Sequence, residues 1–90
     1  MVVNVAGTEG KRYLRTTVEV GAAPKDAKHL EELKAPLLDA AVAVLGKKEL
    51  ASLLEPGDRQ ELREELKTRF NAALGHPLVT HVYLTEFIVQ

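Results

Sequence analysis

The last ten residues, His81-Val82-Tyr83-Leu84-Thr85-Glu86-Phe87-Ile88-Val89-Gln90, decide how a sheet can be built from this chain. Apolar and polar residues alternate along them, as in a strand with one buried face. Val82 and Leu84 share one face, but Phe87 and Val89 fall on the opposite parity, with Thr85-Glu86 at the break. One extra residue there, as in a β-bulge, returns all four to one face. The sequence therefore predicts a long, bulged strand.

Two more strands are predicted near the start of the chain. Val2 to Val5 is a short strand, and Lys11 to Val20 alternates cleanly. The glycine-containing turn from Ala6 to Gly10 suits a hairpin between them. One face of the second strand carries Leu14, Thr16, Val18 and Val20, and the other carries Tyr13, Arg15, Thr17 and Glu19.

Apolar residues at spacings of three and four predict a first helix. It begins near Pro24, with Asp26 in its first turn, and ends at Gly46. Pro36 kinks or divides it, because proline removes a backbone hydrogen bond and clashes with the preceding turn. Its apolar stripe is Leu30, Leu33, Leu37, Ala41 and Val44.

Two further helices are predicted before the last strand. Lys48 to Leu54 is a short helical turn that presents its leucines, Leu50, Leu53 and Leu54, to the core. A long helix begins at Pro56-Gly57-Asp58 and ends at a left-handed cap on Gly75, and Glu65 can pair with Arg69 one turn later. Its stripe is Leu62, Leu66, Phe70, Ala73 and Leu74.

The order of elements is therefore β-β-α-α-α-β. This order predicts a small α+β domain, with a three-stranded antiparallel sheet and helices packed on one face. Residues 1–90 form a single domain, and a chain of this length buries about 60 to 70 per cent of its unfolded surface.

The composition excludes several classes of function. The net charge is −1 and basic residues are interleaved with acidic ones, so there is no basic stripe for nucleic acid. Four aromatic residues and no Trp disfavour base-stacking and sugar-binding surfaces. No cysteine is present to form a disulfide or bind a metal. The longest apolar run, Ala40 to Leu45, is far shorter than the roughly 20 residues of a membrane span.

No arrangement of side chains predicts catalysis, a metal site or a cofactor site. The three histidines, His29, His76 and His81, lack ligand spacing and are expected on a helix, in a loop and on the polar face of the last strand. The glutamates Glu61, Glu64 and Glu65 belong to a solvated, salt-bridged helix face. Ser52 has no nucleophile elbow, so we expect it to make a capping or turn contact. The sequence does not predict an enzyme.

A candidate oligomer or partner surface lies on the outer face of the sheet. Tyr13, Val79, Tyr83 and Ile88 point away from the core if Val82, Leu84, Phe87 and Val89 face it. Together they would form an apolar strip available to another subunit or a partner. Alternatively, helices or a missing N-terminal segment cover that face.

Several segments resemble the flagellar basal-body-associated FliL family. The last nine residues resemble its V-Y-F/L-T-E-F-V/I-V-Q ending, and Asn4-Val5 with Lys11 to Arg15 resembles its "VNL…GKRYLK" opening. Leu37 to Glu55 and Arg59 to Leu74 are similar to two of its helical segments. The chain departs from the family at Gly46 to Glu49, where a Ser-Ser-Lys-Thr turn is common.

The resemblance implies a single-pass inner-membrane protein whose periplasmic domain is residues 1–90, with the N-terminal transmembrane anchor outside them. It also implies a fold similar to the stomatin/prohibitin (SPFH-like) domain, ring-shaped homo-oligomers, and an action on the ion-driven flagellar stator MotA/MotB that supports torque and motility. The function would be binding and not chemistry. One alternative is a stomatin-like scaffold that regulates another membrane complex, such as a protease or channel. Another is an unrecognised hydrolase.

Overall fold

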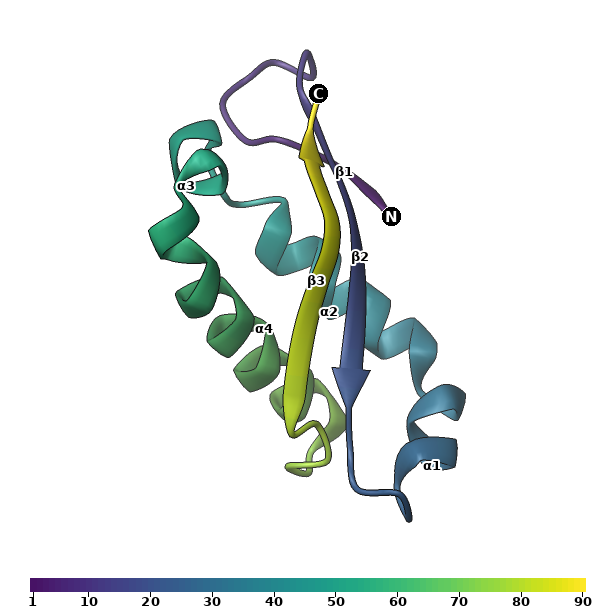
Figure 1. The fold of residues 1–90 in the computed structure, drawn as a ribbon. Helices are drawn as coiled ribbons and strands as arrows, with labels where there is room; N and C mark the ends of the chain where they lie inside the picture. The colour runs from purple at the N-terminus through teal and green to yellow at the C-terminus, as the bar shows by residue number, and fades with distance from the viewer.

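A computed structural model describes all 90 residues as one sheet with helices on one side (Figure 1). The three antiparallel strands lie in the order β1-β2-β3. This arrangement confirms the predicted α+β class, the helices on one face and the order of the elements. The elements are β1 (Val2–Asn4), β2 (Tyr13–Gly21), α1 (Ala27–Glu32), α2 (Lys34–Leu45), α3 (Leu50–Leu54), the 3-10 turn η1 (Pro56–Asp58), α4 (Arg59–Leu74) and β3 (His81–Val89).

The hairpin between β1 and β2 forms as predicted. Val3 lies opposite Leu14 in the antiparallel register. Gly7 and Gly10 have φ angles of 75° and 76°, a backbone region that glycine enters without steric cost. The Thr8 hydroxyl donates to the Val5 carbonyl at 2.7 Å and so stabilises the turn.

The predicted bulge lies in β3. Arg15 pairs with Ile88 and Thr17 with Thr85, so β3 has two residues where β2 has only Thr16. Glu86 has a φ of 49° and is the residue that absorbs the irregularity. As a result Phe87 and Val89 return to the side of the core, together with Leu84.

The first predicted helix is divided into two segments. α1 ends at Glu32 and α2 begins at Lys34, with Leu33 at a non-helical φ of −103° and ψ of 21° between them. Pro36 therefore lies in the first turn of α2, where its missing N–H leaves no hydrogen bond unmade. The predicted start near Pro24 was too early, because Pro24 lies in a turn and α1 begins at Ala27, after Asp26.

In the later helices, the predicted end of α4 is correct, but several predicted side-chain contacts are not. Gly75 ends α4 with a φ of 75°, as predicted. Glu65 does not pair with Arg69; its carboxylate accepts from Lys48 Nζ at 2.6 Å. Leu54 and Ala73 are exposed rather than buried, so the apolar stripes are narrower than expected.

Fourteen buried apolar residues from the sheet and the helices form one core. Leu14 of β2, Leu45 of α2, and Leu66 and Phe70 of α4 are the largest apolar side chains that are completely buried. The core thus lies between the sheet and the α2–α4 pair, and the other sheet face is left to solvent (Figure 1). None of the helices has the length and apolar character needed to cross a membrane.

Candidate interaction surface on the outer sheet face

The outer face of the sheet carries three of the four predicted surface residues. Tyr13 is 43% exposed, Tyr83 52% and Ile88 47%, whereas Leu14, the neighbour of Tyr13, is 1% exposed. Successive side chains of a strand point to opposite faces, and the helices cover only one of them (Figure 1). The bulge is essential to this placement, because an unbulged β3 would turn Ile88 toward the core and Phe87 outward.

Val79 was assigned wrongly to this surface. It lies two residues before β3 and is 1% exposed. The amide side chain of Asn71 in α4 holds both of its backbone polar groups. Val79 N–H donates to Asn71 Oδ1 at 2.8 Å, and Asn71 Nδ2 donates to the Val79 carbonyl at 3.0 Å. Asn71 thereby takes the place of a neighbouring strand and holds the connection against the core.

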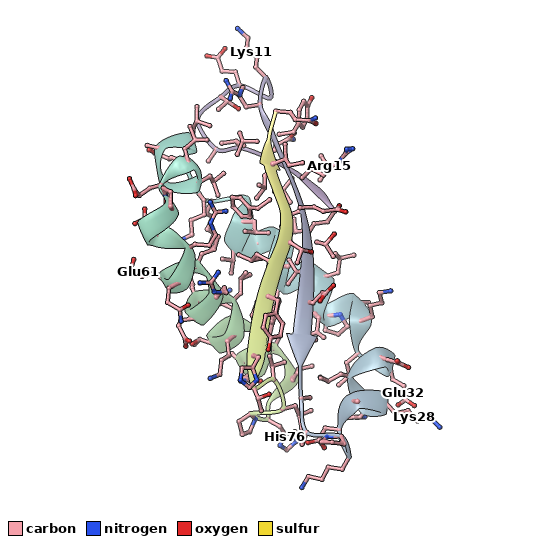
Figure 2. All side chains as sticks on the ribbon, in the orientation of Figure 1. Lys11, Arg15, Lys28, Glu32, Glu61 and His76 are labelled. Carbon is pink, nitrogen blue, oxygen red and sulfur yellow. The ribbon has the colours of Figure 1, made fainter.

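One apolar cluster lies at the end of the sheet where all three strands pair. Val2, Arg15 and Ile88 form a row across β1, β2 and β3. Tyr13 lies in the next row, where its backbone exchanges two hydrogen bonds with Gln90 at 2.8 and 2.7 Å. The side chain of Arg15, labelled in Figure 2, shares this face of the sheet with those of Val2, Tyr13 and Ile88. This end thus presents three apolar side chains around one cation.

A second cluster lies at the other end of β3. The rings of His81 and Tyr83 are stacked, with centroids 6.1 Å apart and an angle of 5° between their planes. Glu19 lies opposite Tyr83 on β2. Gly21 lies beneath His81, since a Cβ at Gly21 would come within 3.3 Å of His81 Cβ. Tyrosine is one of the residue types enriched at protein interfaces.

The two clusters do not form the continuous apolar strip that the sequence predicted. The pair Thr17 and Thr85 lies between them. Tyr83 and Ile88 are two side-chain rows apart, about 13 Å along the strand. The outer face therefore offers two separate contact points with a polar middle.

A polar cluster between α3, η1 and α4 was not predicted. The guanidinium carbon of Arg59 lies 3.5 Å above the centre of the Phe87 ring, and Arg59 Nη2 donates to the Leu53 carbonyl at 3.3 Å. Burial, followed by the nearby charge of Arg63, lowers the pKa of Arg59. In the sequence, Arg59 is only a basic residue that follows the predicted helix start at Pro56-Gly57-Asp58. Nothing in that pattern identifies an aromatic partner.

The side chains around this cluster make structural contacts. Ser52 donates to the carboxylate of Asp58 at 3.3 Å, which is the turn contact predicted for it. The adjoining hollow has a volume of about 70 Å³, enough for only a few water molecules. No three His, Cys, Asp or Glu side chains come together in a way that could hold a metal ion.

The histidines and charged helix residues lie where the sequence placed them. His29 is exposed on α1, His76 is exposed in the loop after α4, and His81 is exposed on β3. Figure 2 shows Glu32, Lys28 and Glu61 pointing from the helices into solvent, away from the sheet. The outer sheet face is therefore the candidate interaction surface that the sequence predicted, with Val79 removed from it.

Two comparisons of the sequence with known proteins point to the same family. The family model described as "Flagellar basal body-associated protein FliL" matches residues 1–90. The chain is also similar to a "Flagellar protein FliL" from Aquifex aeolicus (strain VF5), with 29% identity over 90 residues. That match covers 99% of this chain and 56% of the relative, so the chain spans little more than half of the relative's length.

Proposed function

The chain belongs to the family of flagellar basal body-associated FliL proteins, and we propose that it is a non-enzymatic scaffold of the flagellar motor. In this proposal, copies of the protein form a ring around stator units and support torque generation. The observation that carries the proposal is the family match, which includes every residue of the domain.

The outer sheet face supports a role in binding. It presents two separate groups of exposed side chains on one sheet: Val2, Tyr13 and Ile88, and His81 with Tyr83. A ring of identical subunits needs two different patches on each copy, because each subunit contacts both of its neighbours in a head-to-tail manner. A stator needs a further contact point. The two clusters could supply two of these three contact sites, and neither needs catalytic chemistry.

The proposed partners are other copies of the chain and the MotA/MotB stator. The domain would lie in the periplasm, held at the inner membrane by an anchor outside residues 1–90. The greater length of the Aquifex relative is compatible with such an added segment. A ring would favour the stator conformation that it binds more tightly, by no more than the difference between its two binding free energies.

The test is crosslinking in native membranes. The full-length protein carries an affinity tag, is crosslinked in living cells, and is purified for mass spectrometry beside an untagged strain. We expect ladders of self-crosslinked protein and peptides linked to stator subunits, and we expect motility to weaken on deletion, most strongly under load. Reproducible recovery of another membrane complex without stator subunits would overturn the motor role and favour a stomatin-like scaffold elsewhere.

A further inference from the structure

An apolar groove lies between β2 and the helices α1 and α2. Its volume is about 650 Å³, and nine of its eleven lining residues are hydrophobic. Val18 and Val20 of β2 form one wall, and Leu30 of α1 with Leu37 and Leu38 of α2 forms the other. Leu38 is half exposed there. Because few polar groups converge on the groove, it is built to receive apolar side chains.

The backbone of β2 is open along the same groove. Pairing with β1 reaches only as far as Met1, where Met1 N donates to the Thr16 carbonyl at 2.9 Å and Thr16 N–H donates to the Met1 carbonyl at 3.1 Å. Backbone groups alternate in direction along a strand, so Val18 and Val20 face the same side as Thr16. No strand pairs with them on that side. Figure 1 shows no strand beside this half of β2, and the helices α1 and α2 lie behind and beyond its edge.

The open edge lies on the line of β1. The strands are antiparallel and Met1 lies opposite Thr16. Each residue further upstream of Met1 would therefore lie opposite the next residue of β2 after Thr16. A residue two positions before Met1 would lie opposite Val18, and one four positions before it would lie opposite Val20. Val3 is buried and Met1 packs against the core, so side chains at these two positions would enter the groove.

We propose that the groove and the open edge of β2 bind a segment of the same polypeptide. This segment immediately precedes Met1 in a full-length protein that is as long as the Aquifex relative. The segment extends β1 by about five residues and places apolar side chains two and four positions before Met1 in the groove. The match leaves almost half of the Aquifex relative outside it, so a protein of that length has enough chain for this segment wherever part of the remainder precedes Met1. No turn is needed, and covalent connection to β1 gives the segment a high effective concentration at the edge. This inference is independent of any role in the motor.

A cross-strand disulfide in the full-length protein tests the register. Glu19 lies on the exposed face of β2, at a position where opposite Cα atoms are about 4.5 Å apart, within the range for a disulfide. The residue three positions before Met1 is its expected partner. With cysteine there, Glu19→Cys should form an intramolecular disulfide on mild oxidation. Residues 1–90 contain no cysteine to interfere. Thr17→Cys with the same partner is the control, because its Cα lies about 8 Å away and should not react.

Hydrogen exchange gives a second readout that needs no cysteine. In the full-length protein, the amides of Val18 and Val20 should exchange at least about tenfold more slowly than in a variant with Asp two and four positions before Met1. Thr17 and Glu19 pair with β3, so their amides should exchange equally in both proteins. Equal rates at Val18 and Val20 would overturn the proposal. A disulfide between two protomers would also overturn it, because the edge would then bind a second copy. A gene whose product begins at Met1 would overturn it as well, because the proposed segment would not exist.

Discussion

Adjacent residues of β2 lie in opposite environments. Leu14 and Thr16 are each 1% exposed and face the helices, whereas the alternating residues Tyr13 and Arg15 face solvent. On the inner face, even the buried polar group is satisfied, since the Thr16 hydroxyl donates to the Thr85 carbonyl at 3.0 Å next to the bulge. On the outer face, Tyr13, Tyr83 and Ile88 stay about half exposed, although Tyr83 stacks on His81.

Under the proposed function, this contrast separates the residues that stabilise the fold from those that bind other molecules. Substitutions on the inner face remove packing or leave buried groups unpaired, so they change the free energy of unfolding. Substitutions on the outer face remove exposed side chains and should mainly change the proposed contacts with other molecules. Four predictions, taken from the largest expected effect on stability to the smallest, test that separation.

Phe70→Ala should cause the largest loss. Phe70 of α4 is 1% exposed in the core beneath the sheet, so its truncation leaves a cavity and should cost about 3–5 kcal/mol in the free energy of unfolding. Urea denaturation measures this value. Tyr83→Ala removes an aromatic side chain of similar size from the outer face and should cost less than about 1 kcal/mol. Equal losses would show that the outer face is also packed.

Asn71→Ala should have the second largest effect. It leaves the buried N–H and carbonyl of Val79 without their partners, which should cost about 2–3 kcal/mol. The matched control is Thr68→Ala on the exposed side of α4, for which we expect a change within about 0.5 kcal/mol. The same urea titrations compare the two. A loss no greater than that of the control would mean that Asn71 does not hold the chain before β3.

Glu86→Gly should stabilise the domain. A left-handed residue with a Cβ costs about 1–2 kcal/mol, and the greater flexibility of glycine in the unfolded chain offsets about half of the relief. At the observed φ of 49°, the net gain should be about 0.5–1 kcal/mol, measured as a higher urea midpoint. Glu86→Ala keeps the Cβ and should give no gain. A lower midpoint for Glu86→Gly would mean that the side chain supports the bulge.

Ile88→Arg and Tyr83→Arg should have the smallest effect on folding. Both residues are about half exposed, so each change should alter the free energy of unfolding by no more than about 0.5 kcal/mol. Each should reduce crosslinking to neighbouring copies or to the stator in native membranes. Leu54→Arg, an equally exposed leucine on α3, is the control and should leave crosslinking unchanged. Unchanged crosslinking in both outer-face variants would remove this face from the proposed assembly.

Much of the fold could be predicted because its signals are local. Alternation identified the faces of β2 and β3, and the break in parity at Thr85-Glu86 identified the bulge. Gly75 adopts the left-handed conformation expected of a helix cap, and Pro36 divides a helix as expected. Each of these features depends on a few consecutive residues. The family resemblance was equally accessible, since it is a property of the order of residues.

The contacts of Val79, Glu65 and Arg59 could not be predicted in this way. Alternation placed Val79 outside, but its backbone is held by Asn71, which a turn brings back beside it. Helical spacing paired Glu65 with Arg69, but the folded chain brings Lys48 closer. Arg59 meets Phe87 only because α4 packs against β3. In each case the partner lies outside the local repeat.

The sequence by itself determined the local conformations, the two faces of each strand and the membership of a family. These follow from side-chain periodicity and backbone preference, which act over a few residues. Only the tertiary structure decided which outer-face residues gather into two clusters, and that β1 stops short and leaves the edge of β2 open beside an apolar groove. Such features depend on how far each element extends over its neighbours, and that distance is set by the packing of the whole chain.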